Sequence, residues 1–254
     1  MVEVANSADR VRSILVLVAT VATIVFNGLA AAGYVNGVTS EIISSKYPTI
    51  LTPAAYAFSI WGLIYLGLTA FSVFQLLPAN LNRFRPVRSL YILSCVFNCA
   101  WIYCFHQDQI GICLAIILML WGSLLLIKIK LAGCATLAET WLMQAPFGIY
   151  FGWVTAASLV NLMLFLKYVG SPAASSSYLG SALILSAAAC AVMVRVKLWN
   201  FFYPLAIAWA LTAIAVKQSG NTAIVVSAAL GVVICLVTTG SFVVNLRDST
   251  SEQR

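Results

Sequence analysis

The run IGICLAIILMLWGSLLLI, residues 110–127, decides the class of fold because it carries no charged side chain. A helix needs about 20 mostly apolar residues to cross the hydrocarbon core of a bilayer. The apolar residues of this run are continuous and do not alternate with polar ones, which favours a membrane helix over a strand of a membrane barrel. The stretch therefore predicts a transmembrane helix.

The composition of the whole chain agrees with this prediction. Of the 254 residues, 62% are hydrophobic and 8% are charged. An average soluble domain is about half apolar and about a quarter charged, so this chain lacks the charge to cover a soluble surface. A soluble enzyme, a disordered regulator and a secreted disulfide scaffold are disfavoured. We expect an all-α, polytopic membrane bundle in contact with the lipid bilayer.

Apolar segments of this kind recur along the chain and are separated by polar or basic junctions. We expect about eight transmembrane helices, at residues 13–33, 54–77, 89–106, 110–127, 140–166, 178–196, 201–216 and 223–244.

The basic residues give this bundle an orientation. Cytoplasmic loops of membrane proteins carry an excess of Lys and Arg. With eight helices, 11 of the 14 Lys and Arg residues fall on the side of the N-terminus, and Lys46, Lys167 and Lys217 fall on the other. Both termini are therefore expected in the cytoplasm. The net charge of +7 is then a signal of topology and not of nucleic-acid binding.

The first apolar segment has a second interpretation. Arg10 and Arg12 precede an apolar run that ends in LAAAG (29–33), which is also the pattern of a cleaved signal peptide. The run is long for a signal peptide, and the loop charges favour a retained helix. We expect a multi-pass protein of a bacterial inner membrane, with an organelle membrane as the alternative.

The inventory of reactive groups argues against several functions. No Asp, Glu, Lys or Arg lies near the middle of an expected helix, which disfavours a proton-coupled pump or a carrier of charged substrates. The seven cysteines and the single histidine, His106, lack zinc-site spacing, and no enzyme motif is present. We expect no catalytic residue and no metal site. His106 is interpreted as a polar residue at the membrane interface, with a pH-sensitive loop or an axial ligand to a metal tetrapyrrole as the alternatives.

Aromatic side chains follow one face of three expected helices. Each stripe combines aromatic surface with a group that can form hydrogen bonds. An amide side chain that faces lipid is energetically costly. The stripes should therefore converge inside the bundle, either as an aromatic ligand pocket or as plain packing between helices. Their members are Phe58, Trp61 and Tyr65; Asn98, Trp101 and Phe105; and Pro146, Tyr150, Trp153, Ala157 and Asn161.

Two prolines and two glycines should shape the helices around these stripes. Pro53 opens the second expected helix, and Pro146 lies inside the fifth, where it should kink the helix or free a carbonyl. Gly148 and Gly152 form a GxxxG pattern. Such a pattern lets another helix approach closely, within the bundle or across a homodimer.

Four short motifs together resemble the translocator protein and tryptophan-rich sensory protein family (TspO/MBR). They are TPAAYAFSIWGLIY (52–65), NCAW (98–101), LMLWGSLLL (118–126) and WVTAASLVN (153–161). They occur in the family's order on the corresponding helices. The chain departs from the family in having a single proline, Pro53, before the second helix, and Tyr56 near the place of a tryptophan.

The resemblance implies a receptor or sensor that binds a planar hydrophobic ligand, a tetrapyrrole such as porphyrin or haem, and that is frequently a homodimer. A transporter of a small uncharged or amphipathic solute is the alternative, and light-dependent porphyrin degradation is a further possibility. No cofactor is required beyond such a bound ligand. By motif position, the resemblance implies that the residues nearest the pocket are Trp61, Tyr65, Asn98, Trp101, Trp153 and Asn161. The other ligand-binding residues that we expect are Tyr56, Phe58, Trp121 and Tyr150.

The resemblance also divides the chain into parts. The expected parts are a cytoplasmic tail (1–12), a five-helix ligand-binding bundle (13–166), a linker (167–177), three additional helices (178–244) and a second cytoplasmic tail (245–254).

Overall fold

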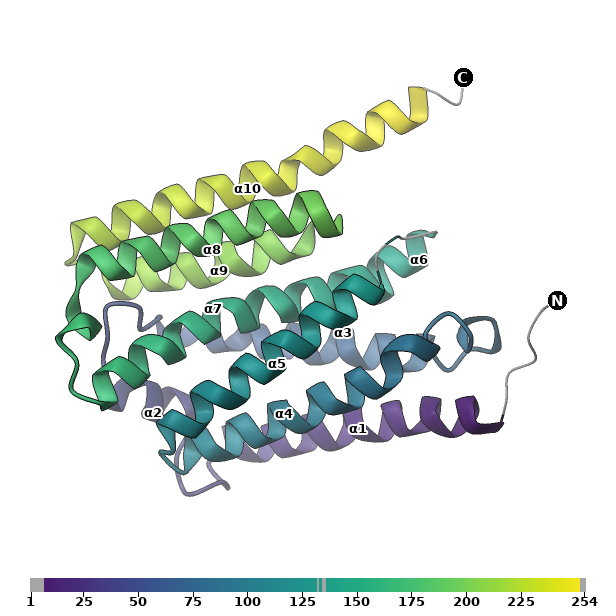
Figure 1. Cartoon of the computed structure of the whole chain (residues 1–254), viewed down its shortest axis with the longest axis horizontal. Coiled ribbons are helices and arrows are strands. Elements are labelled where there is room, and N and C mark those ends of the chain that lie inside the picture. Colours follow the sequence, from purple (N-terminus) through teal and green to yellow (C-terminus); the bar gives the residue numbers. More distant parts are fainter. Residues whose placement is uncertain (1–6, 132, 134–135, 252–254) are drawn as a thin grey trace.

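The computed structural model describes residues 7–131, 133 and 136–251, so the outer ends of the two expected tails lie outside the described residues. Within that part, every regular element is helical. The long helices lie side by side and run roughly along one direction (Figure 1). The prediction of an all-α membrane bundle is confirmed. The long helices are α1 (Ser7–Ala31), α3 (Ile60–Phe74), α4 (Arg88–His106), α5 (Ile110–Lys130), α7 (Ala145–Tyr168), α8 (Ser177–Leu198), α9 (Phe202–Lys217) and α10 (Thr222–Ser251).

Shorter elements connect these helices. Two are short α-helices, α2 (Ser40–Lys46) and α6 (Leu137–Glu139). One is a π-helical turn, Thr140–Gln144, which continues directly into α7. The others are 3₁₀ turns, at Ala55–Ser59, Pro78–Asn80, Arg85–Val87 and Pro172–Ser175.

The helices match the expected membrane spans with one qualification. In the described part, seven helical segments are long and apolar enough to cross a membrane, and α9 is shorter, with 16 residues. A helix of this length spans about 24 Å, somewhat less than the roughly 30 Å hydrocarbon core. The beginning of α1 and the end of α10 lie at the same end of the bundle, as an even number of crossings requires (Figure 1). Which side of the membrane this end faces stays a prediction.

Helix α7 is the centre of the bundle. It packs against α5 and α3 on one side and against α9 on the other, and α9 in turn packs against α8 and α10. The three late helices thus form one group that joins the rest through α7 and α9 (Figure 1). Hydrophobic residues occur on all sides of α7, as expected for a helix enclosed by neighbours.

The GxxxG pattern of α7 makes the close contact with α9. Gly148 lies against the side chain of Asn200, and a Cβ added at Gly152 would lie 2.6 Å from the carbonyl oxygen of Tyr203. It would also lie 2.8 Å from the Cβ of Ala206. Of the two uses expected for this pattern, the structure shows the one within the bundle.

Pro146 lies where the helical geometry changes. The π-helical turn ends at Gln144, and Pro146 occupies the first turn of α7. Proline has no N–H to donate, so a changed hydrogen-bond pattern immediately before it relieves the mismatch. The ring packs on α3, where a Cβ added at Gly67 would lie 3.0 Å from the Cβ of Pro146. The expected irregularity at Pro146 is thus present as a π-helical turn.

Buried charges join the helices at the end of the bundle where α1 begins. Asp9 Oδ2 lies 2.6 Å from Arg85 Nη2, and its Oδ1 lies 3.7 Å from Arg88 Nη1. Arg88 Nε donates to Gln75 Oε1 at 2.9 Å. Because these groups come from α1, from the end of α3 and from the start of α4, they fix these three helices to one another.

Candidate functional site

The three aromatic stripes meet around Trp61. Its ring centroid lies 5.4 Å from that of Tyr65, 6.3 Å from Trp101, 5.9 Å from Tyr150 and 6.3 Å from Trp153. These distances are within the range of favourable aromatic pairs. Helices α3, α4 and α7 therefore bring their aromatic faces together, as the spacing of the stripes predicts.

Two cavities adjoin this cluster. The outer cavity has a volume of about 450 Å³, which is within the usual range for a small-molecule site. The inner cavity is about 30 Å³, enough for a water molecule. Phe58 lines both cavities. The outer cavity is lined by Ile24, Asn27, Gly28, Ala30, Ala31, Thr39, Ser40, Glu41, Phe58, Trp61, Gly62, Tyr65 and Ile102. The inner cavity is lined by Ser44, Pro53, Phe58, Trp101, Phe105, Trp153, Ala156, Ala157, Val160, Asn161, Leu164, Ala210 and Ile214.

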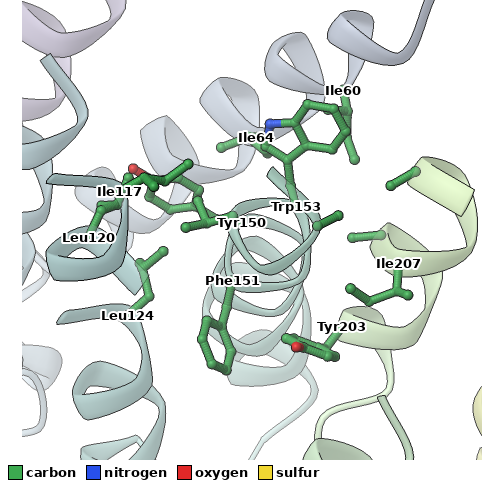
Figure 2. Close-up of a cluster of buried hydrophobic side chains, with 14 of the residues drawn as sticks. Ile60, Ile64, Ile117, Leu120, Leu124, Tyr150, Phe151, Trp153, Tyr203 and Ile207 are labelled. Carbon is green, nitrogen blue, oxygen red and sulfur yellow. The ribbon is translucent and has the colours of Figure 1, made fainter. Parts of the chain in front are cut away.

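The inner cavity contains the hydrogen bond that joins two of the sequence motifs. Trp101 Nε1 donates to Asn161 Oδ1 at 3.2 Å, and Asn161 Nδ2 donates to the carbonyl oxygen of Ala157 at 2.8 Å. Trp153 Nε1 is buried and has no partner in the described part of the chain. Trp153 points from α7 toward Ile60 and Ile64 of α3 (Figure 2).

The side-chain amide of Asn98 forms a hydrogen bond with a residue of α1. Asn98 is fully buried, and its Oδ1 accepts a hydrogen bond of 2.8 Å from Asn27 Nδ2. Asn27 also lines the outer cavity. The sequence analysis did not select Asn27, although the argument applied to Asn98 and Asn161, an amide within an apolar helix, identifies it equally well.

A lid segment, residues 32–54 with α2 inside it, contributes to both cavities and lies across one end of the bundle (Figure 1). His106 holds its first half. The ring Nδ1 lies 3.2 Å from the carbonyl oxygen of Val35, and Nε2 lies 3.0 Å from Ser40 Oγ. The His106 carbonyl accepts a hydrogen bond of 2.8 Å from Asn36 Nδ2. His106 is therefore a polar anchor of the lid and lines neither cavity.

Asp108, in the turn between α4 and α5, holds the middle of the lid. It forms an ion pair with Lys46 and accepts a hydrogen bond of 2.9 Å from the Tyr47 hydroxyl. The hydrogen bond to Asp108 raises the pKa of Lys46 above its ordinary value. Burial, with the bond to Asp108 as a smaller cause, raises the pKa of Tyr47. Both side chains therefore stay protonated at neutral pH, as donors to Asp108 must.

Helix α9 holds the end of the lid and the turn that follows it. The backbone N–H of Ala54 donates to the carbonyl of Ala213 at 2.9 Å, and Trp209 Nε1 donates to the carbonyl of Ala57 at 3.1 Å. Gln218 Nε2 donates to the carbonyl of Thr49 at 2.9 Å and more weakly to that of Thr52 at 3.2 Å. Since α9 also supplies Ala210 and Ile214 to the inner cavity, it is part of the site.

Some of the expected ligand-binding residues lie elsewhere. Tyr56 is 40% exposed and packs edge to face on Trp209, with 5.3 Å between their centroids. Trp121 faces another side of α7, where its Nε1 donates to Thr155 Oγ1 at 2.9 Å. Neither lines the outer or the inner cavity. Phe151, which packs against Trp121, points away from Trp153 (Figure 2).

The other expected residues either line at least one of the two cavities or lie behind the residues that do. Phe58, Trp61 and Tyr65 line the outer cavity, whereas Trp101, Trp153, Asn161 and Pro53 are among those that line the inner cavity. Tyr150 belongs to the cluster around Trp61, and Asn98 lies behind Asn27. Both are buried and line neither cavity.

Comparison with known proteins agrees with this architecture. A family model described as TSPO-like protein matches residues 13–242, which cover most of the chain. The match extends through α8 and α9 and most of α10, so these helices lie inside the matched region. No curated protein and no solved structure gave a match. The family match and the apolar helices show that the chain is an integral, multi-pass membrane protein of the TSPO-like family.

Proposed function

We propose that this protein is a membrane receptor or sensor that binds a planar hydrophobic ligand in the outer cavity. The observation that carries the proposal is the wall formed by Trp61 and Tyr65. Their rings are stacked at 18° with 5.4 Å between centroids, and both line a cavity of about 450 Å³. Both residues contribute aromatic surface to the wall of this cavity, on which a flat hydrophobic ligand can pack.

Polar groups elsewhere in the lining would orient the ligand. Asn27 comes from α1, and Thr39 and Ser40 come from the start of the lid. Aromatic contact and apolar burial would supply most of the affinity, whereas a few amides and hydroxyls would select the edge of the ligand. Binding under the lid would also remove the ligand from water, and signalling would follow from a change in how the lid is held.

The ligand class that we propose is a tetrapyrrole, such as a porphyrin. Among the described residues that line the outer cavity, none is His, Cys or Met, and His106 is engaged with the lid. Because His, Cys and Met are the most common axial ligands of haem iron, this lining favours a metal-free macrocycle over haem. The charged residue on this lining is Glu41, with no Lys or Arg, so an esterified or neutral macrocycle fits better than one whose carboxylates enter the cavity.

Fluorescence titration of the purified protein tests the proposal. Protoporphyrin IX and its dimethyl ester are added in detergent, and quenching of tryptophan emission and the shift of the porphyrin absorption band are followed. We expect saturable binding, tighter for the ester. Trp61→Ala should weaken binding about tenfold, the equivalent of roughly 1.4 kcal/mol. Trp141→Ala is the matched control, because Trp141 is 61% exposed and lines neither cavity.

Two outcomes would overturn the proposal: quenching that does not saturate, or equal affinities for the wild-type protein and Trp61→Ala. The same material separates the alternatives. Flux of the porphyrin across proteoliposomes would indicate a transporter. Bleaching of the porphyrin that requires both light and protein would indicate an enzyme.

A further inference from the structure

A second hollow lies on the outer surface of the late helices, away from the aromatic cluster. It is a groove of about 390 Å³ between α8 and α10. Its apolar walls face outward from the bundle, since Val192, Val196 and Val237 are 38%, 57% and 69% exposed. The groove is lined by Val192, Arg195, Val196, Trp199, Val237, Thr238 and Ser241.

Arg195 places a buried positive charge in this groove. The residue is 5% exposed, and it forms no ion pair with a described residue. Its guanidinium lies over the ring of Phe201, 4.1 Å from the centroid, and 5.6 Å from that of Trp199. Its Nε has no hydrogen-bond partner in the described part of the chain. Aromatic rings that hold the face of a guanidinium leave its N–H groups, which lie in the plane, for an anion.

The position of the groove at the end of α8 is the expected place of a membrane boundary. Arg195 is in the last turn of α8, which ends at Leu198, and Trp199 follows directly. Trp and Arg at the end of a membrane helix mark the boundary between hydrocarbon and water. A buried cation at this boundary, beside outward-facing valines, is complementary to a phospholipid. The cation matches the anionic phosphate, and the valines match an acyl chain.

We propose that this groove binds an anionic phospholipid. The phosphate would accept hydrogen bonds from the Arg195 guanidinium, and one acyl chain would lie along Val196 and Val237. The hydroxyls of Thr238 and Ser241 donate to carbonyls of their own helix, at 2.6 and 2.7 Å, so Arg195 is the group that recognises the anion. Basic pockets between membrane helices are a known type of site for anionic lipid headgroups.

Thermal unfolding of the delipidated protein in detergent tests the proposal. Phosphatidylglycerol, phosphatidylcholine and inorganic phosphate are added separately. Phosphatidylglycerol in hundredfold excess over its Kd should raise the unfolding midpoint by about 5 °C or more. Phosphatidylcholine and inorganic phosphate should raise it much less. The shift should disappear in Arg195→Gln and remain in Lys197→Gln, because Lys197 is exposed on the same helix and does not line the groove.

A second variant tests the apolar half of the site without altering the charge. Val237→Trp should fill the groove at an exposed position and abolish the shift, even if Arg195→Gln does not fold. Four results would overturn the proposal: no shift with phosphatidylglycerol, a shift that persists in Arg195→Gln, a shift lost equally in Lys197→Gln, or a full shift with inorganic phosphate alone. None of these results depends on the outcome of the porphyrin titration.

Discussion

Trp101 and Asn161, 60 positions apart, are joined by a hydrogen bond of 3.2 Å from the indole Nε1 to the amide Oδ1. The bond connects α4 to α7 at the wall of the inner cavity. Both side chains are almost fully buried, so bulk water does not compete for this bond. The two motifs to which these residues belong, NCAW and WVTAASLVN, therefore form one structural unit.

Trp101→Phe should destabilise the protein by about 1 to 3 kcal/mol, because it leaves the Asn161 oxygen buried without a donor. Unfolding by SDS in mixed micelles measures the change. Trp141→Phe, at an exposed position, is the control and should change stability little. Equal stability of Trp101→Phe and the wild-type protein would show that the bond contributes nothing.

Gly152→Ala should also destabilise the protein, because the new Cβ would lie 2.6 Å from the carbonyl oxygen of Tyr203 and force α7 and α9 apart. Overpacking of this kind costs about 1 to 3 kcal/mol. Gly122→Ala on α5 is the matched control, since a Cβ there meets nothing within 4 Å. That change should leave stability unaltered or raise it by up to about 1 kcal/mol, as alanine favours helix. The contact between α7 and α9 is disproved if both variants behave alike.

Gln218→Ala should loosen the end of the lid. The change removes the hydrogen bonds to the carbonyls of Thr49 and Thr52, each worth about 1 kcal/mol. We expect hydrogen exchange of the amides at residues 47–57 to rise about tenfold or more in the ligand-free protein, as measured by mass spectrometry. Lys217→Ala, at the exposed neighbouring position, should leave these rates as they are. Unchanged exchange in Gln218→Ala would mean that α9 does not hold the lid.

The ion pair between Lys46 and Asp108 should be lost at strongly alkaline pH. The pKa of Lys46 is raised above its ordinary value of 10.5, chiefly by its hydrogen bond to Asp108. A raised pKa means that the stabilisation is fully present below pH 10.5 and is lost as the pH rises through the higher value. At pH 9, Lys46 should react more slowly with a reductive methylation reagent than Lys167 does.

Asp108→Asn provides the control for this measurement, because it removes the charge that raises the pKa of Lys46. In that variant the reaction of Lys46 should accelerate, and that of Lys167 should stay the same. Equal acceleration of both lysines would point to a general opening of the chain.

The sequence predicts the helices and the convergence of the aromatic stripes because both depend on local periodicity. Phe58, Trp61 and Tyr65 share a face through helical spacing alone, and an amide such as Asn161 must turn inward from lipid. The partner of a residue is not a local property. Trp121 lies on α5, which packs against α7. The residues next to it in the sequence do not show that its side chain faces Thr155 and not the cavities.

The contribution of α9 to the inner cavity likewise cannot be predicted from the local sequence. Its residues Ala210 and Ile214 read as ordinary packing residues, and they line the inner cavity only because Gly152 admits α9 so close to α7. The GxxxG pattern predicts a close contact and leaves its partner open. The late helices, expected as an addition to a five-helix pocket, therefore supply part of the wall of that pocket.

The contacts between the lid and α9 also set an order of events during synthesis. The carbonyl of Ala57 accepts its hydrogen bond from Trp209, a residue synthesised 152 positions later. The carbonyl of Thr49 likewise has its donor only after Gln218 is synthesised. Because membrane chains are synthesised and inserted from the N-terminus, the early helices meet the bilayer before the lid has its support. A nascent or truncated chain that lacks α9 would then have a lid without these bonds and an inner cavity without the part of its wall that Ala210 and Ile214 supply.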